Sequence, residues 1–332
     1  MEALVFLINK ALVAGLVIGS IYALGAIGVT LIFGILRFAH FAHGDLMTLG
    51  AFFTLALAGI GASLGIATPF PIALAALLPA MLLTAASAIA IDRTFYRPLR
   101  LAKVRPIIIV IASVGVTLML QGAIRLVAGV GTRNMFFDQA KDIHRFTLPG
   151  ARREIVMTEP QVVLVALTIC AMVGLHWFLT RSRLGKAMRA VSDNPDLARI
   201  TGIDTDRVVR ATWVTAGALA CAAGSLLSMD VFLKPDLAFN LLLPIFAAAI
   251  VGGIGQPFGA IAGGFLIGFS ETLAIFDWGV LFRELNPLLP ALLQLPTSFA
   301  FVPTEYKLMV PFVILIIVLV YRPTGVFRGK VF

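Results

Sequence analysis

The sequence predicts an all-α polytopic membrane protein with about eight or nine transmembrane helices, one or two of them broken or re-entrant. Hydrophobic residues make up 60% of the 332 residues and charged residues only 13%, whereas soluble domains are about a quarter charged. The apolar runs are continuous rather than alternating, which favours helices over a β-barrel. No polar stretch is long enough to build a soluble unit, so residues 1–332 are predicted to form a single transmembrane domain.

The spans follow from the apolar runs, because a helix needs about 20 apolar residues to cross the bilayer. The first run is long and rich in glycine, so it is either one tilted helix or a helix with a break. The 241–253 run is short and favours a half-helix or one leg of a hairpin. The predicted spans are residues 8–35, 46–65, 70–91, 106–128, 161–180, 211–229, 241–253, 260–276 and 308–321.

Orientation follows from the distribution of lysine and arginine, which collect on the cytoplasmic side of an inner membrane. The 93–105 loop carries five basic residues and the 181–210 loop carries seven, and the tail after Tyr321 is also basic. Nine spans place all three on the cytoplasmic side and the N-terminus outside. The 129–160 loop then lies outside, where FTLPGARREIV is predicted to form a small hairpin. The formal net charge of +9 is explained by this bias and does not indicate nucleic-acid binding.

A first polar interruption is FAHFAHGDLMTL, which spans residues 38–49. One interpretation is a short cytoplasmic turn in which Asp45 caps the next helix. The other is a broken helix at membrane depth, whose N-terminus points at a polar ligand in the translocation path. The candidate path residues here are His43, Gly44, Asp45 and Thr48. A metal site built from His40, His43 and Asp45 lacks a further ligand cluster, and neither a bound metal nor a catalytic residue is predicted.

A second interruption is VGGIGQPFGAIAGG, which spans residues 251–264. Glycines at four-residue steps suit close packing of helices, and no basic residue follows them, as a phosphate-binding loop would need. The alternative is again a discontinuous helix near the substrate path, which would match the first interruption in the other half of the chain. The candidate path residues here are Gly252, Gly253, Gly255 and Gln256.

One acidic side chain, Glu271, lies inside the predicted 260–276 span. Charged groups within spans are costly and usually have a specific role. Its position near the outer end favours a structural role, in which the carboxylate reaches the headgroups or pairs with Arg125 at similar depth.

The charge-dense segment from Arg181 to Arg210 is predicted to form short amphipathic helices with breaks at Asn194-Pro195 and at Gly202. One interpretation is a solvated loop held by anionic lipid. Against it, an apolar face recurs at helical spacing, which favours a docking surface for a partner. That face consists of Leu184, Met188, Val191, Leu197, Ile200 and Ile203.

Three blocks resemble the LivH-type permeases of branched-chain amino acid ABC importers. They are GSIYALGAIGVTLIFGILRFAHFAHGDLMTLGAF at 19–52, RLGKAMRAVSDNPDLARITGIDTDRV at 183–208 and AAAIVGGIGQPFGAIAGGFLIG at 247–268. They occur in the family's order, and the resemblance covers nearly the whole chain apart from the 131–160 and 277–307 loops. Residues 41–45 match the family's FAHGD block, whereas His40 stands where a common family form has Asn.

The resemblance implies a permease subunit in the bacterial inner membrane without ATPase activity of its own. It would import branched-chain amino acids together with a second, LivM-like permease, two cytoplasmic ATP-binding subunits and a periplasmic binding protein, surrounded by membrane lipid. ATP and Mg would be bound by the partner subunits, and this chain would hold no cofactor. The 181–210 segment would be the coupling loop to the ATPase, with Arg183, Gly185, Ala187, Met188, Asn194, Ala198, Arg199 and Gly202 as its predicted residues.

Three rival functions stay open at this point. The same family could import urea or short amides, a secondary transporter could work alone, or a membrane enzyme could use His40, His43 and Asp45. No chain of acids and histidines crosses the spans, which gives little support to a proton-coupled transporter. Co-purification with an ATPase would separate the first rival from the other two.

Overall fold

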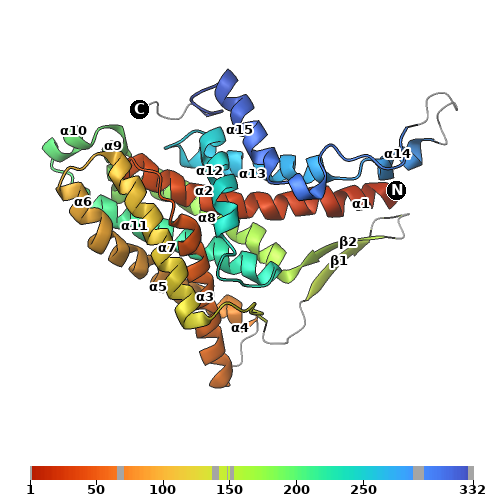
Figure 1. Ribbon diagram of the computed structural model, residues 1–332, viewed down its shortest axis with the longest axis horizontal. Coiled ribbons are helices and arrows are strands. Elements are labelled where there is room, and N and C mark those ends of the chain that lie inside the picture. Colours follow the sequence, from red (N-terminus) through yellow and green to blue (C-terminus); the bar gives the residue numbers. More distant parts are fainter. Residues whose placement is uncertain are drawn as a thin grey trace.

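The computed structural model describes residues 2–65, 71–136, 142–147, 149, 153–286 and 295–327, and it is almost entirely helical (Figure 1). Long helices are joined by short helical or irregular segments, and one two-stranded hairpin interrupts them. The elements are α1 Glu2–Leu7, η1 Ile8–Val13, α2 Ala14–Leu36, α3 His43–Ser63, α4 Ile72–Ala75, α5 Leu77–Ile91, η2 Asp92–Tyr96, α6 Arg97–Leu101, α7 Pro106–Ala128, β1 Ile143–Thr147, β2 Glu154–Thr158, α8 Glu159–Arg181, α9 Arg183–Asp193, α10 Pro195–Ile200, α11 Thr205–Asp230, α12 Phe239–Gly252, α13 Pro257–Ile275, α14 Gly279–Leu285, η5 Thr304–Tyr306 and α15 Met309–Tyr321.

The described residues contain seven helices long and apolar enough to cross a membrane, and two shorter apolar helices, α12 and α15. These nine helices confirm the predicted fold class. The first span is one continuous helix from Glu2 to Leu36 with a π-helical stretch, η1, in place of a break. The predicted start of the basic loop at residue 93 is wrong, because the helix continues through η2 and α6 to Leu101. Part of the predicted 70–91 span, at residue 70, lies outside the described residues.

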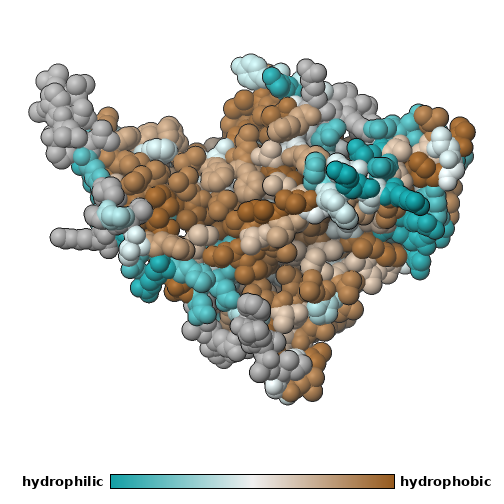
Figure 2. Space-filling model, turned by 180° about the vertical axis from the view of Figure 1, so that it is seen from behind, coloured by the Kyte–Doolittle hydropathy of each residue, from teal (hydrophilic) through white to brown (hydrophobic). Residues whose placement is uncertain are grey.

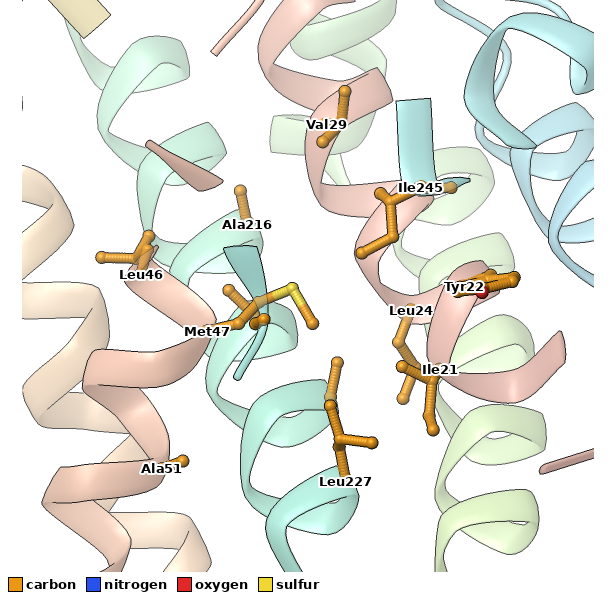
Figure 3. Close-up of a cluster of buried hydrophobic side chains, with 14 of the residues drawn as sticks. Ile21, Tyr22, Leu24, Val29, Leu46, Met47, Ala51, Ala216, Leu227 and Ile245 are labelled. Atoms are coloured by element: carbon orange, nitrogen blue, oxygen red, sulfur yellow. The ribbon is translucent and has the colours of Figure 1, made fainter. Parts of the chain in front are cut away.

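Helix α2 lies at the centre of the molecule and is buried along most of its length. It packs against α13, α11, α12 and α8. Glycines bring the backbones together: a Cβ on Gly264 of α13 would lie 2.5 Å from the backbone N of Ala23. Small residues at such crossings give membrane helices their close packing. Figure 3 shows the apolar cluster that results, with Leu24 of α2, Met47 of α3 and Leu227 of α11 turned toward one another.

The polar segments gather at two ends with an apolar belt between them (Figure 2). One end, here called the basic end, carries α6, α9 and α10 (Figure 1), and an ion pair of 3.0 Å between Arg97 and Asp206 joins its two basic segments. The tail reaches the same end, where the Val326 N–H donates to the carbonyl oxygen of Val251 (2.8 Å). The three basic segments therefore share one side, as the charge bias predicts, and that bias assigns the side to the cytoplasm.

The opposite end carries the N-terminus, α14 and the hairpin of β1 and β2 (Figure 1). The two strands pair antiparallel with Ile143 opposite Thr158, which confirms the predicted hairpin, although its turn lies largely outside the described residues. Asn9 holds the hairpin against the first helix: its Nδ2 donates to the Glu154 carbonyl (2.8 Å), and its Oδ1 accepts the Val156 N–H (3.0 Å).

Candidate translocation site and docking surface

The irregular part of the first interrupted segment, residues 38–42, is buried or half-buried in the protein. Helix α2 ends at Arg37, whose left-handed backbone (φ 56°) redirects the chain. The segment then folds back between α2 and α7, and the Phe41 N–H donates to Ser113 Oγ of α7 (3.2 Å). Helix α3 begins at His43, whose ring contacts Gly28 on α2, so that a Cβ there would lie 2.5 Å from His43 Cε1. The described geometry fits a broken helix, with irregular backbone buried in protein.

His40 and His43 are buried, and no ring nitrogen of either closes a hydrogen bond of good geometry with a described residue. The His40 ring makes edge contacts with Trp213 and Tyr96, at centroid distances of 5.0 and 5.5 Å. The described residues include no group of three His, Cys, Asp or Glu side chains arranged to hold a metal ion. The two imidazoles belong to an aromatic cluster, with ring centroids 6.1 Å apart.

Asp45 does not cap α3. The residue stands in the first turn of the helix, where the N-terminal dipole favours a carboxylate, but the N-cap position belongs to Ala42. Its carboxylate is fully buried and faces Thr117, Gln121 and Arg125 of α7. Neither carboxylate oxygen closes a hydrogen bond of good geometry with a described residue. The capping interpretation is wrong, and Asp45 presents an acceptor group to a polar surface.

That polar surface is a stripe along α7, formed by Ser113, Thr117, Gln121 and Arg125. Residues four apart lie on one face of a helix, and three of these side chains are buried. Arg125, the exposed member, donates to Gln121 Oε1 (3.5 Å). This stripe is not predicted in the sequence analysis, although polar residues at regular four-residue spacing within an apolar span indicate a functional face.

Thr48 connects the first interruption to the start of α12. Its hydroxyl accepts the N–H of Ala238 (3.3 Å), the residue that precedes α12. Ala238 is fully buried, and a Cβ on Gly44 would lie 2.8 Å from the Ala238 carbonyl oxygen. Helix α12 therefore begins beside the start of α3, directly after the buried Ala238. Helix α12, Phe239–Gly252, agrees with the short half-helix predicted at 241–253.

The 251–264 segment is a tight turn between α12 and α13 at the basic end. Gly253 and Gly255 have φ values of 111° and 81°, which favour glycine. A Cβ on Gly252 would collide with the carbonyl oxygen of Gly259, so the glycines serve close helix packing. Gly255 and Gln256 line a cleft of about 280 Å³ that Met188 of α9 also lines. They lie with the predicted coupling loop, apart from the His43–Thr48 group.

The predicted breaks of the 181–210 segment are confirmed: α9 and α10 are separated at Asn194, and α10 is followed by a turn at Gly202 (φ 83°). Each helix has a side-chain cap. Ser182 Oγ accepts the Gly185 N–H (2.8 Å), and Asn194 Oδ1 accepts the N–H groups of Asp196 and Leu197 (3.1 and 3.0 Å). These caps satisfy backbone donors that short helices otherwise leave to solvent.

The apolar face expected on this segment divides between its two helices. Met188 and Val191 of α9 are buried against α2, α8 and α11. Leu197 and Ile200 of α10 are 58% and 83% exposed, so they do not pack onto their own chain. Helix α9 thus anchors the segment, while α10 projects two aliphatic side chains into solvent.

The other predicted coupling residues fall into the same two groups. Gly185 and Ala198 are buried and Ala187 is half-buried, and a Cβ on Gly185 would collide with the Phe178 carbonyl. The exposed members are Arg183, Asn194, Arg199 and Gly202.

Glu271 is buried in α13, and its Oε2 accepts the hydroxyl of Tyr22 of α2 (2.7 Å). The expected contact with headgroups or with Arg125 is wrong, because the carboxylate points to the central helix and Arg125 bonds within α7. The structural role expected for Glu271 agrees with this position between two packed helices.

Residues 11–319 match the family described as the branched-chain amino acid transport system / permease component. The chain belongs to this family. It is 32% identical over 316 residues to the high-affinity branched-chain amino acid transport system permease protein LivH of Escherichia coli (strain K12), covering 94% of this chain and 92% of the relative. It is 31% identical to BraD of Pseudomonas aeruginosa over 96% of this chain and 94% of that protein.

A probable LivH of the archaeon Methanocaldococcus jannaschii is 29% identical over 81% of this chain and 82% of the relative. Among solved structures, PsaBC from Streptococcus pneumoniae in complex with Fab has a TM-score of 0.47 and 14% identity, over 96% of this chain and 95% of that chain. The family match confirms the resemblance carried by the three sequence blocks and makes the chain a multi-pass membrane permease. None of the relatives named here supports the urea or amide alternative.

Proposed function

We propose that this chain is the permease subunit of an ABC importer that moves leucine, isoleucine or valine across the bacterial inner membrane by alternating access. The substrate follows from the relatives, whose names specify branched-chain amino acids. The observation that carries the proposal is the exposure of Leu197 and Ile200 on the capped helix α10 at the basic end. Exposed aliphatic side chains on an ordered polar segment mark a surface that a partner covers.

The partner at α10 is proposed to be an ATP-binding subunit. Helix α9 is anchored in the membrane domain through Met188 and Val191, so a push on α10 reaches α2, α8 and α11 as a rigid-body movement. Two such subunits would bind ATP and Mg, a LivM-like permease would complete the pore, and a periplasmic protein would deliver the substrate. This chain would supply no ATPase activity and bind no cofactor.

The substrate path is proposed to run between α3 and α7. An apolar groove of about 480 Å³ separates these helices, and its walls include Phe52 and Leu55 of α3 and Ile124 and Val127 of α7. Gln121 and Thr117 precede the groove residues on α7 and lie opposite Asp45. A branched-chain amino acid needs both surfaces: aliphatic walls for its side chain and polar groups for its ammonium and carboxylate groups.

The test is co-purification of the ATP-binding subunit with Leu197→Asp/Ile200→Asp. We expect at least a tenfold loss of bound ATPase, because two buried charges without partners would replace apolar contacts. Leu101→Asp is the matched control: Leu101 is 72% exposed on α6 at the same end and should retain the ATPase. Equal loss in the control, uptake by the isolated chain in liposomes, or full binding by the double variant would each contradict the proposal.

A further inference from the structure

A small pocket at the basic end is lined by four arginines: Arg93, Arg97, Arg100 and Arg210. The first three follow one another at spacings of four and three residues along η2 and α6, and Arg210 comes from α11. This spacing places side chains on one face of a helix. The two elements thus turn their guanidinium groups toward a common space of about 80 Å³, large enough for a single small anionic group.

The acids of the pocket leave part of this charge uncompensated. Asp92 is held by Arg100 in a two-pronged contact, with N–O distances of 2.5 and 3.0 Å, and Asp206 pairs with Arg97 at 3.0 Å. Four arginines against two aspartates leave a formal excess of two positive charges. Arg93 and Arg210 carry it, since neither forms an ion pair with any described residue.

The inner wall of the pocket adds a further donor. Trp213 lines the pocket and is 1% exposed, and its indole N–H has no acceptor within the described chain. Its ring is fixed by stacking on Tyr96, with centroids 5.5 Å apart and planes 7° from parallel. Indole and guanidinium groups donate hydrogen bonds and accept none. A buried donor without an acceptor costs free energy that an oxyanion at this position would recover.

We propose that this pocket binds a phosphate group. Guanidinium groups suit phosphate because they donate two parallel hydrogen bonds to its oxygens, and a basic pocket between membrane helices on the cytoplasmic side is a setting for lipid headgroups. The phosphate belongs either to an anionic phospholipid or to free inorganic phosphate. Because η2 and α6 extend α5, and α10 is followed by α11 after a turn at residues 201–204, a bound phosphate ties the proposed ATPase-docking segment to the neighbouring span. The binding itself does not depend on the proposed function.

The test uses the full chain purified in detergent, with native mass spectrometry to measure binding of phosphatidylglycerol and phosphatidylcholine. We expect the wild type to prefer phosphatidylglycerol, and Arg93→Gln/Arg210→Gln to weaken that binding at least tenfold. Lys103→Gln/Arg105→Gln removes the same charge from the same end outside the pocket and should change it less than twofold. Equal weakening in both double variants, or in neither, would overturn the proposal.

Two further measurements test where the phosphate binds and whether it comes from a lipid headgroup or from free phosphate. Trp213→Phe keeps an aromatic ring against Tyr96 but removes the N–H, and we expect about fivefold weaker binding at an unchanged melting temperature. Unchanged binding would show that the anion does not reach the indole and would overturn this assignment of the pocket. Inorganic phosphate at millimolar concentration displaces the lipid if free phosphate is the ligand and leaves it bound if the headgroup is. In either case the arginine variants must lose the binding.

Discussion

The two interrupted segments, residues 38–49 and 251–264, look alike in sequence and differ in structure. Both break apolar runs with glycine, and both lie near a helix start. The first keeps buried polar side chains without partners, with Asp45 facing a polar stripe on α7. The second packs its backbone closely, with Gly252 against Gly259, and its one polar side chain, Gln256, lines the cleft at the basic end. A glycine-rich break therefore indicates either a site or a packing contact, and the polar groups opposite it decide which.

The cause of the difference is where each segment lies. The first segment folds back into the protein, so its polar groups leave water and need partners there. The second turns at the basic end, where the tail covers it through the Val326 and Phe327 N–H groups, which donate to Val251 and Gly252. Burial of a polar group in a membrane protein is costly enough that it usually serves function.

The largest effect is expected for Gly252→Ala, which tests the packing role of the second segment. The added methyl collides with the Gly259 carbonyl, which is backbone and cannot move aside as a flexible side chain would, so the cost is about 3 kcal/mol or more. We expect the amount of folded protein in the membrane and the uptake to fall together, as quantitative blotting and transport assays would measure.

Its matched control is Gly115→Ala on α7, where a Cβ would meet nothing within 4 Å. This variant should keep both expression and uptake, since alanine favours a helix more than glycine does. Normal expression of Gly252→Ala with lost uptake would contradict the comparison, because the second segment would then act in transport.

The sequence predicts the apolar helices well because each one depends on a local pattern. The breaks around α10 are equally local, since Asn194 caps the helix that it precedes. What the sequence does not reveal is which faces meet. The position of the start of α12 depends on Ala238 reaching Thr48, a contact across 190 residues. The partner of Glu271 is Tyr22, 249 residues away, and no periodicity in either helix predicts that pairing.

A smaller effect on folding but a large one on transport is expected for Asp45→Asn. The change keeps the shape of the side chain and removes its charge opposite Thr117, Gln121 and Arg125. We expect uptake to fall at least tenfold, which corresponds to about 1.4 kcal/mol in the transport barrier, while the amount of protein in the membrane stays near wild type.

Thr117→Val should lower uptake in the same direction, because it removes a hydroxyl from the stripe that faces Asp45. Thr168→Val is the matched control: Thr168 is a buried threonine on α8 whose hydroxyl donates to the Leu164 carbonyl within its own helix. Parallel loss of uptake and expression in Asp45→Asn would mean that the first segment, too, serves packing alone.

The smallest effect is expected for Tyr22→Phe. This change leaves a buried polar side chain without its partner in α13, which is the feature that distinguishes the first segment. Removal of the hydroxyl deprives the buried Glu271 carboxylate of its 2.7 Å hydrogen bond, at a cost of about 1–3 kcal/mol. A thermal melt of the purified protein should show a midpoint a few degrees lower, with uptake per folded molecule unchanged.

Glu271→Gln should behave alike, because the amide still accepts the Tyr22 hydroxyl but loses the stronger charge-assisted bond. Loss of uptake at an unchanged melting midpoint would instead place Glu271 with Asp45 among the residues proposed to face the substrate.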